Sequence, residues 1–185
     1  MSIPLRNPAD AFRLLVDLGA SQRLVRHHEL VVEAATILCQ KVFDGFSVAF
    51  HREAVLLGAA LHDVGKMLHP DELQAPGHRH EQAGQSLLIE RGVKPDIARF
   101  CVTHAAWHEP ECVLEDLLVA LADKLWKGKR EQDLEARVLD TLAKSAGREP
   151  WEVFDQLDTI CEQIAADGPS RLDRSISSTG DHVGI

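Results

Sequence analysis

Apolar residues recur along this chain with the period of an α-helix, and no stretch alternates in the manner of a β-strand. The first long stripe predicts a helix over 21–42, with Leu24, Val31 and Leu38 on one face. Similar stripes predict further helices over 80–91, 94–108, 131–147 and 150–166. The pattern therefore predicts an all-α fold, a single-domain helical bundle.

Two segments are apolar around their whole circumference, "REAVLLGAALHDV" at 52–64 and "VLEDLLVALADKLWK" at 113–127. A helix without a polar face is typical of the centre of a bundle, so both are predicted to be buried. Gly65 follows the first segment and is predicted to cap its C-terminus.

The C-terminal part of the chain differs from the rest. From 168 to 185 the helical period is lost, and Ser, Gly and Asp become frequent. We predict one helical domain over 1–167 and a mobile tail over 168–185. A length of 185 residues suits one domain.

Composition narrows the function classes. The formal net charge of -9 and the pI near 5.5 argue against a protein that coats nucleic acid. Four cysteines without a CxxC motif indicate free thiols in a reducing compartment, and neither a signal sequence nor a membrane-length apolar run is present. We therefore expect a cytoplasmic protein without a membrane partner. The oligomeric state stays open, a homodimer included.

The most informative residues are the polar ones on apolar faces. His27 shares a face with Leu24 and Val31, His62 and Asp63 close the first buried segment, and Asp123 interrupts the second. Burying an unpaired carboxylate costs several kcal/mol or shifts its pKa until it is neutral. A divalent metal ion is the simplest common partner for two imidazoles and two carboxylates on separate buried helices.

Each of these residues also has a simpler explanation. A lone buried histidine is often a core residue bonded to a carbonyl, and Asp63 and Asp123 could pair with Lys66 and Lys127. His28, beside His27, is predicted to lie on the surface. The metal is favoured because it accounts for all of the buried polar residues at once.

Two further histidines fit the same centre. His80 precedes Gly84 by one helical turn, which leaves bare backbone where another group can approach closely. His104 lies on the face of Cys101, whereas His108 stands next to the helix-breaking Glu109-Pro110. We therefore favour His104 over His108.

The ordered set resembles the HD superfamily of metal-dependent phosphohydrolases. "LHDVGK" is close to the HD-x-G-K signature, and "RHHELVVEAATIL" resembles the first helix of that family in a register that selects His27. "HEQAGQSLL" and "VTHAAWH" are similar to segments with extra histidines in dinuclear members, and "ALADKL" to the segment with the last metal aspartate. The resemblance covers about 20–130, which would be the metal core, followed by C-terminal helices over 131–166.

The resemblance implies a ligand set and a mechanism. His27, His62, Asp63 and Asp123 would hold one ion, and His80 and His104 would join a bridging Asp63 around a second. One or two ions of Mn, Fe, Co, Ni or Zn suit these ligands. Asp63 and Lys66 would be the catalytic residues: a metal-activated water would attack the phosphate of a small phosphorylated substrate, and Lys66 would add positive charge, unless it is simply solvated.

Three functions stay open. The leading one is a phosphomonoesterase or phosphodiesterase acting on a nucleotide or other small phosphorylated metabolite. The others are a di-iron oxygenase on the same scaffold and a non-catalytic, metal-stabilised sensing module. The sequence lacks the Gly-Tyr-Pro of the HD-GYP class, and "ADKLWKG" replaces the Tyr-rich segment of the dinucleoside tetraphosphate hydrolases.

Overall fold

A computed structural model describes residues 4–177 and confirms the all-α prediction, since those residues contain helices and no strand. The elements in chain order are α1 (Pro8–Asp17), α2 (Gln22–Phe46), α3 (Arg52–Leu61), the 3-10 helices η1 (Val64–Met67) and η2 (Pro70–Leu73), α4 (Arg79–Glu90), α5 (Pro95–Ala98), α6 (Phe100–Thr103), α7 (Leu114–Leu125), α8 (Gln132–Ala146), α9 (Pro150–Ala166) and α10 (Gly168–Ser177). Within residues 4–177, no helix combines the length and apolarity that crossing a membrane would require.

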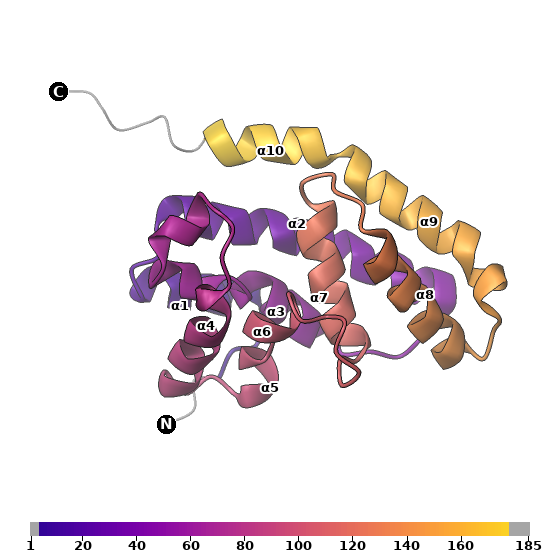
Figure 1. Cartoon of the computed structure of the whole chain (residues 1–185), viewed down its shortest axis with the longest axis horizontal. Coiled ribbons are helices and arrows are strands. Elements are labelled where there is room, and N and C mark those ends of the chain that lie inside the picture. Colours follow the sequence, from indigo (N-terminus) through magenta and orange to yellow (C-terminus); the bar gives the residue numbers. More distant parts are fainter. Residues whose placement is uncertain (1–3, 178–185) are drawn as a thin grey trace.

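The two segments that are apolar all round form the centre of the bundle, as predicted. In α7 all residues except Glu115 and Lys124 are buried, and α3 is buried from Leu57 to its end. Helix α7 runs through the middle of the molecule and packs against α2, α3 and α8 (Figure 1). Neighbours on every side thus explain why α3 and α7 are apolar around their whole circumference.

The core has two parts, and α3 belongs to both. The larger part is shared by α2, α7, α8 and α9, and the smaller by α1, α3 and α4. Val55 and Ala59 of α3 pack into the larger part, whereas Leu57 and Leu61 pack into the smaller. Because α3 lies between them, the residues that follow its last turn are placed where the two parts meet.

Gly65 has a different role from the predicted helix cap. It lies within η1 and does not have a positive φ angle, so no left-handed cap forms there. A Cβ on Gly65 would lie 1.9 Å from the carbonyl oxygen of His80 and 2.6 Å from the backbone nitrogen of Gly84. Gly65 therefore allows α4 to approach η1, and the bare backbone expected at Gly84 receives Gly65 itself.

Two boundaries also differ from the prediction. The helix expected over 94–108 consists of the short α5 and α6 and ends at Thr103, so His108 lies in the turn that follows. The supposed tail is helical over 168–177, while 178–185 lie outside the described residues. Helix α10 follows α9 directly and lies against α2 (Figure 1). The polar sequence of α10 did not predict a helix, because ion pairs rather than an apolar stripe fix this helix to its neighbour.

Candidate metal centre

Five helical segments bring the six predicted ligands together where the two parts of the core meet. His27 comes from α2, His62 and Asp63 from the end of α3, His80 from α4, His104 from the end of α6, and Asp123 from α7. Two groups contain carboxylates: His27, His62, Asp63 and Asp123 form the first, and Asp63, His80 and His104 the second. A further possible group, His27, His28 and His62, has no carboxylate. In each group the potential ligand atoms lie within 4.8 Å of one another.

Asp63 belongs to both groups because its two oxygens face different histidines. Oδ2 lies 3.1 Å from Nε2 of His27 and 3.5 Å from Nε2 of His62. Oδ1 lies 3.1 Å from Nε2 of His80 and 3.6 Å from Nε2 of His104. Asp123 joins the first group, with Oδ1 3.5 Å from Nε2 of His62. The carboxylate of Asp63 thus stands between two pairs of imidazoles.

Three of these imidazoles are held by acceptors at their other nitrogen. Nδ1 of His62 lies 3.1 Å from the carbonyl of Ala59, and Nδ1 of His104 lies 3.0 Å from that of Phe100. When Nδ1 donates its proton to such an acceptor, the lone pair of Nε2 is directed at the ligand site. The geometry favours this tautomer at both residues.

Glu72 holds the third imidazole and was not predicted from the sequence. Its Oε2 accepts a hydrogen bond of 2.6 Å from Nδ1 of His80, and it is almost fully buried. Burial opposes ionisation of Glu72, but hydrogen bonds from His80 and Arg79 outweigh it and lower the pKa to about 2. The segment "PDELQAPGHRH" shows no helical period, so the contact between Glu72 and His80 was not predicted. The only signal that could have suggested it is that Glu72 lies near His80 in the chain.

His28 is buried, contrary to the predicted surface position. Its side chain is fully enclosed, Nδ1 bonds the carbonyl of Leu24 at 3.0 Å, and Nε2 accepts the backbone N–H of Asp63 at 3.3 Å. Burial and the neighbouring imidazoles hold the pKa of His28 well below its usual range, so it is neutral. With both nitrogens occupied, His28 positions the Asp63 backbone, and His27 is the residue that faces the cluster.

The electrostatics of the cluster favour a cation. Burial alone would lower the pKa of His62, but the carboxylates of Asp63 and Asp123 raise it to about 9. Burial would raise the pKa of both carboxyl groups, yet His62 holds both well below the usual range. In the metal-free protein a proton on His62 therefore partly balances two buried carboxylates, a task that a bound cation can perform.

Within residues 4–177, several buried atoms of the cluster have no hydrogen-bond partner. They are Nε2 of His27, His62 and His80, and Oδ1 of Asp63. Buried polar atoms normally form hydrogen bonds, since leaving one of them without a partner costs about 1–3 kcal/mol. The unpaired atoms are those that face the interior of the two groups, so the residues present fit a divalent metal ion.

Three lysines lie close to the carboxylates of the cluster, and two of them, Lys66 and Lys127, line the cavity. Nζ of Lys66 lies 2.5 Å from Oδ2 of Asp63, and Nζ of Lys124 and Lys127 lie 3.1 and 4.0 Å from Oδ2 of Asp123. The ion pairs considered for Lys66 and Lys127 are therefore both present beside the cluster.

His104 and His108 occupy different environments. His104 is 6 % exposed and belongs to the cluster, whereas the His108 side chain is 65 % exposed and lies near Glu109. Burial and the His62 imidazole lower the pKa of His104 to about 4, which keeps it neutral as a ligand requires. The structure brings His104, not His108, to the centre.

The cluster opens into a cavity of about 560 Å³. His27 and Asp63 form its floor, and Lys66 and Lys127 stand at the side. The ring of Trp126 meets that of His27 edge-on, with centroids 5.1 Å apart. This volume lies within the usual range for small-molecule sites, so a ligand in the cavity would reach the metal centre.

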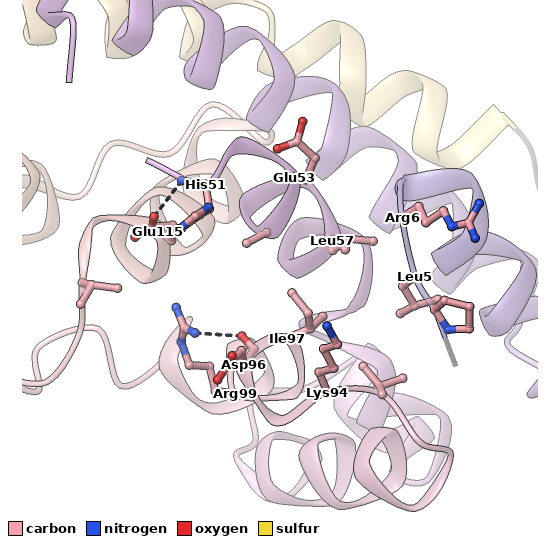
Figure 2. Close-up of a pocket in the computed structure, with 14 residues that line it drawn as sticks. Leu5, Arg6, His51, Glu53, Leu57, Lys94, Asp96, Ile97, Arg99 and Glu115 are labelled. Atoms are coloured by element: carbon pink, nitrogen blue, oxygen red, sulfur yellow. Dashed lines mark hydrogen bonds between the residues drawn. The ribbon is translucent and has the colours of Figure 1, made fainter. Parts of the chain in front are cut away.

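A larger cavity of about 710 Å³ lies elsewhere, between the N-terminal segment, α3, α5 and the start of α7 (Figure 2). Leu57 and Ile97 point into it, and Glu115 accepts the backbone N–H of His51 at its edge. None of the possible metal-ligand groups among residues 4–177 lies there. Its size alone therefore does not make it the chemical site.

Comparison with known proteins agrees with the site. The family model described as HD domain matches residues 24–142, which contain all six clustered ligands. This chain belongs to the HD-domain family. A search of solved structures found no match. HD-domain proteins are largely metal-dependent phosphohydrolases and include non-catalytic members, so membership suggests divalent metal binding and leaves the reaction of this HD-domain protein to be tested.

Proposed function

We propose that the chain is a metal-dependent phosphohydrolase that cleaves a phosphate ester of a nucleotide or another small phosphorylated metabolite. The observation that carries the proposal is the set of unpaired Nε2 and carboxylate atoms that converge beneath a ligand-sized cavity. The cavity wall contributes Lys66 and Lys127, which suit an anionic substrate. Membership of the HD-domain family supports the same reaction class.

The residues divide between two ions. His27, His62, Asp63 and Asp123 would hold one, and His80 and His104 would hold a second, with Asp63 shared. A bound ion supplies a Lewis acid for phosphoryl oxygens and lowers the pKa of water to about 7. The nitrogen and oxygen donors suit Mn, Fe, Co, Ni or Zn.

The side chains of the protein account for substrate positioning. Lys66 lies at Asp63 and lines the cavity, so its ammonium can pair with a phosphoryl oxygen that enters beside this carboxylate. Lys127 approaches from α7 and adds a second positive charge. Trp126 and Leu73 cover the adjacent wall with apolar surface, which limits the access of water to the bound phosphate.

The test combines elemental analysis with an activity screen. Purified protein is analysed for bound metal, reloaded with Mn, Fe, Co, Ni or Zn, and assayed for phosphate release from nucleotides, sugar phosphates and aryl phosphates. We expect up to two ions per chain and release from at least one ester class. Loaded protein that cleaves no ester would contradict the proposal. Oxygen uptake with an organic substrate would then indicate the oxygenase, and metal binding without turnover the sensing module.

A further inference from the structure

Helix α10 forms one wall of the cavity into which the metal centre opens. Leu172, Ser175 and Ile176 of this helix line the same 560 Å³ as His27 and Asp63. The HD-domain match ends at residue 142, so this wall comes from a part of the chain that the family model does not include. A ligand that touches the metal centre is therefore bounded by α10 as well.

The positively charged residues of the cavity lining suit a phosphate group. Arg23, which is exposed, lines the cavity with Lys66 and Lys127. Both lysines already face carboxylates, whereas the guanidinium of Arg23 bonds the backbone carbonyl of Leu73 at 3.4 Å. Within residues 4–177, no ion pair joins Arg23 to a carboxylate, so its charge is available to an anion.

Another part of the cavity lining is apolar. Leu172 and Ile176 are one helical turn apart on α10, and they are 38 % and 69 % exposed. Trp126 and Leu73 line the cavity with them. The hydroxyl of Ser175 donates to the carbonyl of Leu172 at 2.6 Å, so its proton is already engaged. Sugar hydroxyls or a nucleobase edge placed here would lose hydrogen bonds to water without replacement.

Helix α10 is held firmly enough to act as a wall. On the side facing α2, both oxygens of Glu33 bind the guanidinium of Arg174 at 2.8 Å. Nε of Arg171, which is fully buried, lies 3.1 Å from Glu33, and its Nη1 donates to the carbonyl of Ile164 at 2.7 Å. The arginines on one face of α10 thus fix the position of the apolar residues that line the cavity.

We propose that α10 selects the substrate, and that the preferred substrate is a phosphate ester whose alcohol carries an aromatic or branched aliphatic group. The phosphate lies at Arg23 and the metal centre, and the apolar group packs on Leu172 and Ile176. The proposal rests on the proposed function for the position of the phosphate. It goes further by assigning substrate preference to two residues outside the matched domain.

The test uses two phosphonates that cannot be hydrolysed at phosphorus, phenylphosphonate and methylphosphonate. Their binding to the metal-loaded protein is measured by isothermal titration calorimetry. They share the anionic group and differ in the ring, so we expect phenylphosphonate to bind about 10-fold more tightly or better. Equal affinities, or no binding of either compound, would overturn the proposal.

Variants assign the preference to α10. Leu172→Asn and Ile176→Asn are each expected to reduce the preference for phenylphosphonate several-fold and to leave methylphosphonate affinity unchanged, which also shows that the variant is folded. Arg23→Gln should weaken the binding of both compounds equally. Ile89→Asn is the matched control, because Ile89 is an exposed isoleucine on α4 that does not line the cavity. An unchanged preference in both α10 variants contradicts the role of this helix.

Failure of this proposal and failure of the proposed function give different results. If the protein binds the phosphonates with the expected preference but hydrolyses no ester, the selection by α10 is supported and the phosphohydrolase function is contradicted. Hydrolysis with higher kcat/KM for sugar phosphates than for 1-naphthyl phosphate would confirm the reaction and overturn the apolar preference.

Discussion

Two regions of the molecule line the same cavity, and they are built in different ways. The metal centre is polar, almost entirely buried and assembled from helices within the HD-domain match. The α10 wall is apolar on the cavity side, largely exposed and outside that match. The two regions line the same cavity, one with polar and the other with apolar side chains.

The difference lies in how each region is held. At the metal centre, Glu72 bonds the imidazole of His80 and His28 bonds the backbone of Asp63, so buried partners orient these two ligands. At the wall, one carboxylate, Glu33, binds both arginines of α10. We infer that the centre tolerates little change without loss of the reaction, whereas the wall can vary and change only the choice of substrate.

The largest effect is expected from Asp63→Asn. An amide cannot supply two anionic oxygens to the two groups, so metal content should fall toward zero and activity by more than about 100-fold, since even outer partners of a metal ligand are worth about 10–100-fold. Elemental analysis and phosphate release measure both. Asp133→Asn, on an exposed position of α8, is the control. Retained metal at both groups would show that Asp63 is not shared.

Gly65→Ala should disrupt the centre through the backbone. The new Cβ would meet the carbonyl oxygen of His80, which has no flexible end to move away, so α4 must shift. We expect a loss of about 3 kcal/mol in the free energy of unfolding, the upper end for overpacking, and weaker metal binding.

Urea denaturation measures the loss. Gly45→Ala is the control, because the Cβ there would meet the end of the flexible Gln156 side chain. If Gly65→Ala and Gly45→Ala unfold at the same urea concentration, the close approach of η1 and α4 does not hold the centre together.

Glu72→Gln should affect one half of the centre. The amide NH₂ would face the backbone N–H groups of Arg79 or His80 that now donate to the carboxylate, and His80 would lose its charged acceptor. Metal affinity of the group containing His80 and His104 should fall about 10–100-fold, while the group containing Asp123 is retained.

A metal titration that resolves one ion from two provides the measurement. Glu81→Gln is the control, since Glu81 lies on α4, the helix of His80, and its carboxylate pairs with the exposed His78. Equal weakening of both groups would mean that Glu72 supports the fold in general rather than His80 in particular.

The smallest effect is expected at the wall. Glu33→Gln removes the charge that binds both arginines of α10, so amide hydrogen exchange over 168–177 should become about 5-fold faster, equivalent to about 1 kcal/mol, while metal content is unchanged. Asp44→Asn is the control, because Asp44 is exposed and accepts a hydrogen bond from Gln40 on its own helix. Loss of metal in Glu33→Gln would show that wall and centre are not independent.

Much of the centre could be predicted because burial makes polar residues conspicuous. His62, Asp63 and Asp123 stand in segments that are otherwise apolar, and the helical period shows that they point into the core. Helix content and the central position of α3 and α7 follow from the same periodicity.

Other features could not be predicted from periodicity. His27 and His28 are adjacent on the same edge of the buried stripe of α2, and only the packing of α3 places one at the cavity and the other beneath Asp63. Gly65 was expected to be a cap, because sequence shows the absence of a side chain and not which backbone will approach it. Glu72 lies in an irregular loop, where no period indicates the direction of a side chain.

The sequence by itself determined the all-helical bundle and the buried polar residues, because helical periodicity and the cost of burying charge act locally along the chain. Only the tertiary structure decided which groups come together: the two oxygens of Asp63 between pairs of imidazoles, and α10 in the lining of the same cavity. These contacts join residues far apart in the chain, and ion pairs such as Glu33 with Arg174 leave no periodic pattern that would reveal them.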